Sequence, residues 1–325
     1  MSARRRVVLA VAAIAAAAVA VVTVAALSSG DGSADATAST TTPEQRPGRP
    51  PLSFALGFRQ DPEARDLAQG AALYRRGDTK GAAALFAKYD SLEAKVGAAF
   101  ATWPDGTLDR LEQLAKLYPD EAVVQLHLGL ARLWANQGDP VEAWRAVLDE
   151  EPDTPYAIVA GNLLHPDLPR GLPAFIPSFA APPAITHLPP ERQLEALRAA
   201  ADRGGLRAEL LYGVGLQRVG RPVSAARVFD RAARRFPHDV EAQVAGAVGQ
   251  FDKDAPERAF GRLGPLTRTY PDEPTVRFHL GVLLLWTGRV DAAKRQFRLA
   301  SHVQPGSPLA READRYLETI RRARG

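Results

Sequence analysis

The chain contains no cysteine in its 325 residues. This absence excludes a disulfide framework, a zinc site with cysteine ligands, a catalytic thiol and the lipidated cysteine of a bacterial lipoprotein. A cysteine-free chain is compatible with either side of a membrane. The location of the protein therefore has to be inferred from other features of the sequence.

The short motifs that mark most catalytic and ligand sites are also missing. The six histidines are His127, His165, His187, His238, His279 and His302. None of them has the spacing of metal ligands. Gly213-Val214-Gly215 falls inside a helical pattern rather than after a strand, so it is not a dinucleotide loop. We therefore expect no catalytic residue, no metal ligand and no cofactor.

Basic charge is present but is not concentrated. The net charge is +4, and Arg4, Arg5 and Arg6 supply three of these charges, which leaves about +1 for the rest of the chain. A nucleic-acid-binding protein needs a concentrated basic face that neutralises several phosphates. The sequence therefore predicts no nucleic-acid partner.

An apolar run near the N-terminus predicts a membrane anchor. Residues 7–27 are apolar except for Thr23, and as a helix they would span about 30 Å, the thickness of a bilayer core. The arginines at 4–6 precede this run, so the positive-inside rule places the N-terminus in the cytoplasm and the remaining chain outside. The alternative is a cleaved signal peptide, with acceptable cleavage sites at 24–26 and 34–36, which would make the protein secreted.

The C-terminal half carries a repeat of 34 residues, the spacing between Pro237, Pro271 and Pro305. Seven residues recur after two periods: Gly213, Leu216, Gly220, Ala225, Phe229, Ala232 and Pro237 return as Gly281, Leu284, Gly288, Ala293, Phe297, Ala300 and Pro305. The first glycine allows close helix packing, and the second suits the left-handed end of a helix. The alanines and the phenylalanine form one helical stripe, and the proline ends the unit.

The N-terminal half contains the same pattern in part. Gly70, Leu73, Gly77, Ala82 and Phe86 have the spacings of Gly213 to Phe229. Residues 119–134 and 271–286 are identical at nine of sixteen positions, and this duplication places His127 and His279 at equivalent positions. The unit around residues 92–119 is shortened. Internal repetition therefore extends through both halves of the chain.

These residues resemble the tetratricopeptide repeat, a family with this period and these small, aromatic and proline positions. The resemblance implies an all-α, right-handed solenoid of stacked helix–turn–helix units, whose first helices line a concave groove. In the family this groove commonly holds a peptide or a partner helix. The family's basic and asparagine clamp for a chain-terminal carboxylate is not visible here.

The expected segments follow from the repeat and from composition. They are a basic start (1–6), a transmembrane helix or signal anchor (7–27), a disordered linker (28–55), N-terminal repeats (56–155), an irregular repeat (156–205), three repeats (206–306) and a C-terminal capping helix (307–325). The irregular repeat contains a Pro-rich loop at 165–190 with Phe175, Ile176 and Phe179. We expect this loop to cover a surface, and the alternative is a linker between two repeat blocks.

The expected function is that of a non-enzymatic, extracytoplasmic protein–protein interaction scaffold of the cell envelope. The candidate groove residues for a partner segment are Leu126, Leu130, Trp134, Phe278, Val282 and Trp286. These side chains are apolar, which favours an apolar partner, although such a stripe is also typical of a packed core. Two alternatives remain open: an accessory or enzyme domain with a small-molecule pocket under residues 165–190, and a homo-oligomer that forms through the groove.

Overall fold

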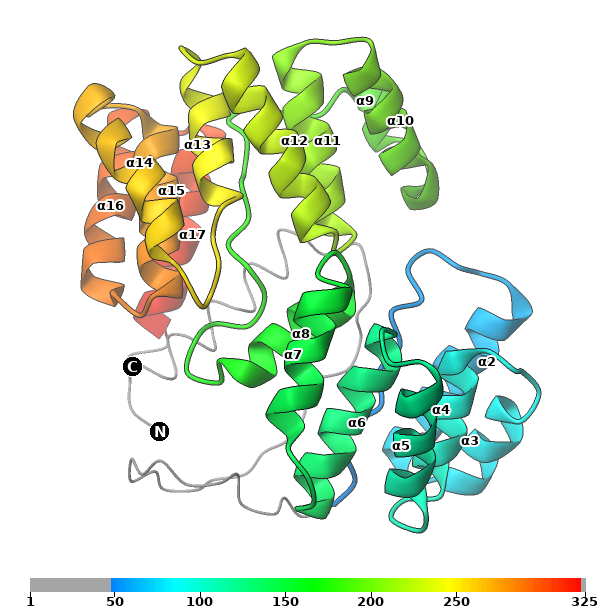
Figure 1. Cartoon of the computed structure of the whole chain (residues 1–325). Helices are drawn as coiled ribbons and strands as arrows, with labels where there is room; N and C mark the ends of the chain where they lie inside the picture. Colours follow the sequence, from blue (N-terminus) through cyan, green and yellow to red (C-terminus); the bar gives the residue numbers. More distant parts are fainter. Residues whose placement is uncertain (1–47, 323–325) are drawn as a thin grey trace. The chain divides into compact units, whose positions relative to one another are not determined.

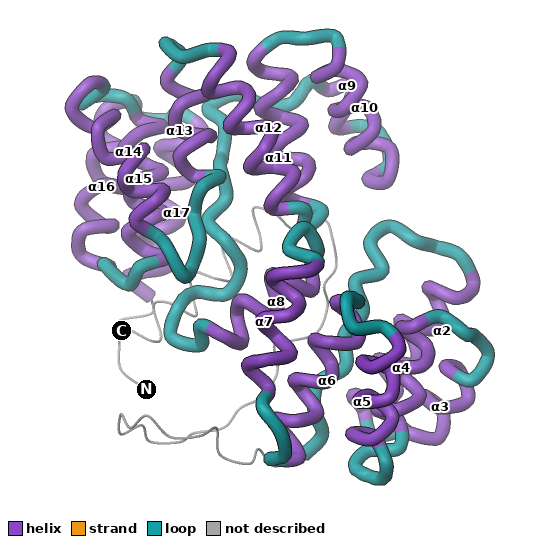
Figure 2. The backbone as a smooth tube through the Cα atoms, viewed as in Figure 1, coloured by secondary structure: helices purple, strands orange, loops and turns teal. Residues whose placement is uncertain are grey.

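The computed structural model describes residues 48–322, and all regular secondary structure within this range is helical. The all-α prediction is therefore confirmed for these residues (Figure 1, Figure 2). The described chain divides between Leu164 and His165 into two compact units. We call residues 48–164 the N-terminal unit and residues 165–322 the C-terminal unit, and each has its own hydrophobic core.

The N-terminal unit is a stack of helical hairpins. Its helices are α2 (Pro62–Arg76), α3 (Thr79–Phe86), α4 (Leu92–Ala101), α5 (Thr107–Leu117), α6 (Ala122–Ala135), α7 (Pro140–Glu150) and α8 (Pro155–Leu164). Each helix packs on the next one in the chain, and α2, α4, α6 and α8 also contact one another in that order. These four helices therefore form one layer of the stack.

The C-terminal unit repeats this arrangement. Its helices are α9 (Pro183–Thr186), α10 (Pro190–Asp202), α11 (Leu206–Arg218), α12 (Pro222–Arg235), α13 (Val240–Val248), α14 (Glu257–Thr269), α15 (Pro274–Trp286), α16 (Val290–Val303) and α17 (Pro308–Arg322). Helices α11, α13, α15 and α17 contact one another in order and form the corresponding layer. The last helix, α17, buries Leu309, Ala313, Tyr316 and Ile320 and leaves its charged face exposed.

A glycine on the first helix of a helical hairpin packs against an aromatic ring on the second helix of the same hairpin. A Cβ atom added to Gly213 would lie 2.2 Å from Phe229, and one added to Gly281 would lie 2.7 Å from Phe297. The glycine therefore allows the ring to lie directly on the helix backbone. In the N-terminal unit, Gly70 has this relation to Phe86.

The turn glycines have the backbone conformation that the sequence predicts. Gly77, Gly220 and Gly288 have φ angles of 92°, 71° and 72°. After α11, the Gly220 N–H donates to the carbonyl of Gln217 and the Arg221 N–H donates to that of Leu216. These two bonds satisfy carbonyl groups that the helix end leaves free.

Three sequence expectations need revision or fall outside the described range. The expected anchor, 7–27, lies outside it, and none of the helices within residues 48–322 has the length and apolarity to cross a bilayer. The expected disordered linker, 28–55, is wrong for its last residues, because Leu52 is buried and its neighbours are hydrogen-bonded to the N-terminal unit. The expected irregular repeat, 156–205, has its two main helices in different units, since α8 packs on α6 and α7 whereas α10 packs on α11.

The Gly213–Phe229 contact gives a direct test of this packing. Gly213→Ala should lower the free energy of unfolding by about 1–3 kcal/mol, because the new methyl group has to displace a buried ring. Gly261→Ala, in α14, is the matched control: nothing lies within 4 Å of its added Cβ. The control should raise stability by about 0.5–1 kcal/mol through helix propensity. Denaturant unfolding curves measure both, and equal stability of the two variants would contradict the packing model.

Candidate functional site

The structure places five of the six candidate groove residues in the packed interior. Those five are Leu126, Leu130, Phe278, Val282 and Trp286, all buried, whereas Trp134 is partly exposed. These residues lie on α6 and α15. Each of these helices contacts a neighbour on either side within its layer and also packs on the next helix of the chain, so most of its surface is covered. This burial favours the core interpretation of the stripe. Contact of these residues with a partner stays a prediction.

An extended segment of the chain itself crosses the N-terminal unit. We call residues 50–56 the N-terminal strap. The Ser53 N–H donates to Nε2 of His127 at 3.4 Å, and the Ala55 N–H donates to the Tyr156 hydroxyl at 3.0 Å. The Tyr74 hydroxyl donates to the Pro50 carbonyl at 3.0 Å. The strap is therefore tied by its main chain to helices α2, α6 and α8.

The strap also contributes side chains to the core of this unit. Leu52 is buried, and the Phe54 ring packs edge-on against Phe86 at 6.0 Å between centroids. The same ring lies 5.9 Å from the imidazole of His127. The strap is consequently an integral part of the unit rather than a free tether.

A second extended segment crosses the C-terminal unit. We call residues 173–179 the C-terminal strap, which belongs to the loop that leads into α9 (Figure 2). The Ile176 N–H donates to Nε2 of His279 at 3.0 Å, and the Ser178 N–H donates to Oε1 of Glu241 at 2.8 Å. The Phe175 ring is buried and stacks on His279 at 5.0 Å. The loop thus covers a surface of its own unit, as its apolar residues predict.

The two straps are bound in the same way. Ser53 and Ile176 donate to equivalent histidines, and in each strap the residue two positions later donates a second N–H. Alternate residues of an extended chain face the same side, so both N–H groups point toward the helices. The residue before the first donor, Leu52 or Phe175, is buried in each case. The shared geometry defines one type of site, built once in each unit.

The hydrogen bonds determine the tautomer of each histidine. Nδ1 of His127 lies 2.6 Å from the Val123 carbonyl oxygen, and Nδ1 of His279 lies 2.7 Å from that of Thr275. A carbonyl oxygen only accepts, so Nδ1 carries the proton. A strap N–H only donates, so Nε2 has to offer its lone pair. Both imidazoles are therefore neutral, and burial lowers the pKa of each to about 4 against the opposing effect of the hydrogen bond from Nδ1 to a carbonyl of its own helix.

Other buried polar groups hold the straps. Burial raises the pKa of Glu241, and the hydrogen bonds from Ser178 partly oppose this shift. Burial lowers the pKa of Lys253 to about 8, and its Nζ donates to the Pro169 carbonyl at 3.0 Å, just before the C-terminal strap. Burial also raises the pKa of Tyr156, which keeps its hydroxyl neutral over the whole physiological range.

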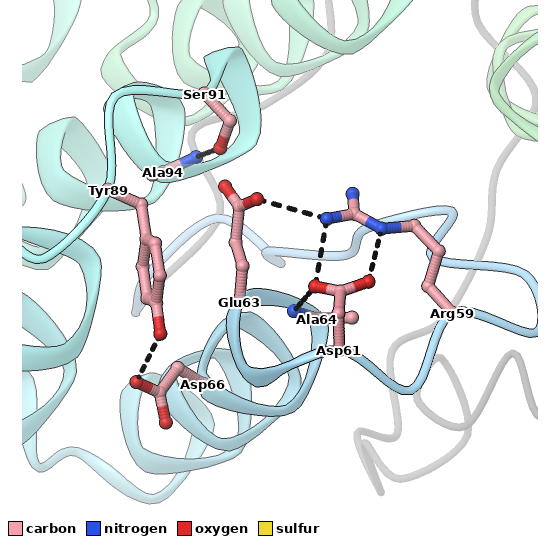
Figure 3. Close-up of polar contacts among 8 residues, drawn as sticks. All are labelled: Arg59, Asp61, Glu63, Ala64, Asp66, Tyr89, Ser91 and Ala94. Atoms are coloured by element: carbon pink, nitrogen blue, oxygen red, sulfur yellow. Dashed lines mark hydrogen bonds and ion pairs between the residues drawn. The ribbon is translucent and has the colours of Figure 1, made fainter.

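A cluster of charges fixes the point where the N-terminal strap leads into α2 (Figure 3). Asp61 caps α2 by accepting the Ala64 N–H, and Arg59 binds both oxygens of Asp61 and one of Glu63. The hydrogen bond from Arg59 and the capping bond lower the pKa of Asp61 to about 2. The carboxylate is therefore charged at neutral pH and suits the positive end of the helix dipole.

The buried histidines predict how stability depends on pH. The unfolded chain binds a proton on each histidine near pH 6.5, whereas the folded chain does so only near pH 4. Between these values the unfolded state holds more protons. The free energy of unfolding should therefore decrease as the pH is lowered from 6.5 to 4, by up to about 3 kcal/mol for each histidine. His127→Gln and His279→Gln should each remove one histidine's share of this decrease in the free energy of unfolding. Denaturant curves measured from pH 7.5 to 4.5 give the decrease for each variant.

The raised pKa of Glu241 acts in the opposite sense, so each histidine variant has to be compared with the wild type over the whole range. His302→Gln is the matched control, because His302 is exposed on α16. An unchanged pH profile in both buried-histidine variants would contradict the neutral, buried state of these histidines.

Comparisons with known proteins assign no family to this chain. No family model matches it, and no curated protein matches it. Among solved structures, a tetratricopeptide repeat protein from Parabacteroides merdae is similar at 12% identity and a TM-score of 0.34, over 80% of this chain and 98% of that one. Yeast Tom70 is similar at 12% identity and a TM-score of 0.23, over 85% of this chain and 67% of that one. These TM-scores are too low to support the fold, which rests on the helices and contacts described above.

Proposed function

We propose that the protein is a non-enzymatic scaffold that binds an extended segment of another protein through its helical units. The observation that carries this proposal is the shared geometry of the two straps. In each unit, side-chain acceptors receive two main-chain N–H groups of an extended segment, and the two donors are two residues apart. Recognition of the main chain, with pockets for alternate side chains, is a general way to bind an extended peptide.

The partner segment has to replace a strap or bind to the surface beside it. His127 and His279 are fully buried beneath the straps, so a new segment reaches their Nε2 atoms only after the strap has moved. Trp134, the partly exposed member of the candidate groove, lies on the same helix as His127. It is the position at which contact with a partner is easiest to detect.

The proposed location is outside the cytoplasm, in the cell envelope. It rests on the sequence alone: the arginines at 4–6, followed by the apolar run at 7–27, predict export of the remaining chain. An uncleaved segment would tether the helical units to the membrane, and cleavage would release them. Either outcome gives the units access to other envelope proteins.

One observation bears on the alternative of an enzyme with a pocket under residues 165–190. A histidine and an acid do lie beneath this loop, namely His279 and Glu241. However, Nε2 of His279 and Oε1 of Glu241 both accept N–H groups of the C-terminal strap. Neither atom can take a proton from a substrate while the strap is bound. The geometry therefore supports binding of a segment better than acid–base chemistry.

Photo-crosslinking in intact cells tests the proposal. A photoreactive amino acid at Trp134 should give a crosslinked product with one envelope protein, and the same group at Gln113, exposed on α5, should not. Equal products at both positions, or none at Trp134, would contradict binding at this site. A product of two copies of this chain would instead identify a homo-oligomer. Trp286→Ala is less suitable, because removal of a fully buried tryptophan costs about 3–5 kcal/mol of stability.

A further inference from the structure

Each strap histidine makes two hydrogen bonds, one as a donor and one as an acceptor. One ring nitrogen donates to a carbonyl of its own helix, and the other accepts an N–H of the strap. Protonation of Nε2 replaces its lone pair with an N–H that faces the strap N–H, across 3.4 Å at Ser53 and 3.0 Å at Ile176. Two donors that face each other lose their hydrogen bond and repel, and the buried charge adds a desolvation penalty. The imidazolium form is therefore incompatible with the strap in its bound position.

Among the described residues, His127 has no charged partner that would offset this charge. Phe54 of the strap, Phe100 of α4 and Tyr156 of α8 contact its ring. Tyr156 stays neutral in acid, and the charged groups that act on it are Glu93, Glu151 and Arg59. Burial lowers the pKa of His127, and no charged side chain contributes to this shift.

His279 has a similar environment. Phe175 of the strap stacks on its ring, and Phe278 packs against it edge-on from the same helix. The titratable and charged groups around the strap are Glu241 of α13, which accepts the Ser178 N–H, Arg207 of α11, over the Phe179 ring, and Lys253, which donates to Pro169. A protonated Glu241 can still accept through one oxygen, so His279 is the group whose titration breaks the strap contact.

We propose that His127 and His279 are acid-operated latches: protonation of Nε2 releases the strap that the histidine holds and exposes the helix surface beneath that strap, while the helices remain folded. Each strap is held by a few hydrogen bonds and one or two buried side chains. The helices have their own layer contacts, and the glycine–aromatic contacts join one helix directly to the next. Strap rings pack against two of these aromatic side chains, Phe86 and Phe229, but the contact between glycine and ring is made by the helices alone. Local opening therefore needs less free energy than global unfolding.

The expected pH range follows from the same linkage. A released imidazole is exposed and regains a pKa near 6.5, whereas the bound one titrates near pH 4. The equilibrium constant for release then rises about tenfold for each pH unit below 6.5, to a maximum of about 300-fold near pH 4. The inference rests on the proposed function only for its consequence, the exposure of a surface that a partner segment can bind, because release itself requires no partner.

Hydrogen–deuterium exchange of the full chain, followed by mass spectrometry from pH 7.5 to 4.5, tests the latches. After correction for the intrinsic pH dependence of exchange, peptides that cover 50–56 and 173–179 should lose protection by up to about 100-fold between pH 6.5 and 4.5. Peptides from α6 and α15 should keep their protection. Straps that stay protected at pH 4.5, or that lose protection together with the helices, would overturn the proposal.

Two variants assign the effect to each histidine. His127→Gln keeps an acceptor but does not titrate, so it should remove the pH response of the N-terminal strap and leave that of the C-terminal strap intact. His279→Gln should do the reverse, and His302→Gln should change neither. An unaltered response in both variants would contradict the latch even if release occurs. Crosslinking at Trp134 at neutral pH reports separately on the proposed function, so either proposal can fail without the other.

Discussion

An extended segment that lies across a layer of helices has to place its own N–H groups in a buried site. The helix carbonyl groups are poor acceptors for them, because each already accepts a hydrogen bond within its own helix. A side chain has to supply the acceptor, and it has to do so without an unpaired charge in the interior. A neutral imidazole meets both conditions when its other nitrogen donates to the carbonyl four residues earlier, as in His127 and His279. Tyr156 and Glu241 accept the second main-chain N–H of each strap and complete the arrangement that this acceptor makes possible.

The same constraint explains why the two strap sequences differ while their binding is alike. The donors are main-chain N–H groups, so Ser53 and Ile176 serve equally well although their side chains have little in common. Only the preceding position, Leu52 or Phe175, requires a large apolar side chain. The duplicated helices, in contrast, retain the histidine in both copies. The internal duplication therefore accounts for the helices that form the two strap sites, but not for the straps themselves.

Much of the fold could be predicted from the sequence, because the determining residues have fixed spacings. Gly213 with Phe229 and Gly281 with Phe297 mark the hairpins, and the turn glycines mark the helix ends. The straps could not be predicted in this way, since main-chain recognition leaves no periodic pattern. The composition of residues 28–55 therefore predicts a linker that includes residues 50–55. The available signal was the presence of His127 and His279 at equivalent positions of otherwise apolar helices.

The candidate groove shows a different limit of the sequence. A helical stripe indicates which face of a helix is apolar, but not whether that face meets a partner or the rest of the unit. Trp286 and Phe278 are buried by neighbouring helices, whereas Trp134 retains some exposure. The distinction depends on how the layers pack, which involves residues far away in the sequence. The histidines, rather than the tryptophans, mark the place where an extended segment lies.

The central claim is that two neutral imidazoles hold the straps through Nε2. The ¹⁵N chemical shifts of the histidine side chains test it most directly, because a protonated and an unprotonated ring nitrogen are well separated in the spectrum. At pH 7 both His127 and His279 should have a protonated Nδ1 and an unprotonated Nε2, and this state should persist to about pH 5. A protonated Nε2 at neutral pH in either residue would contradict it.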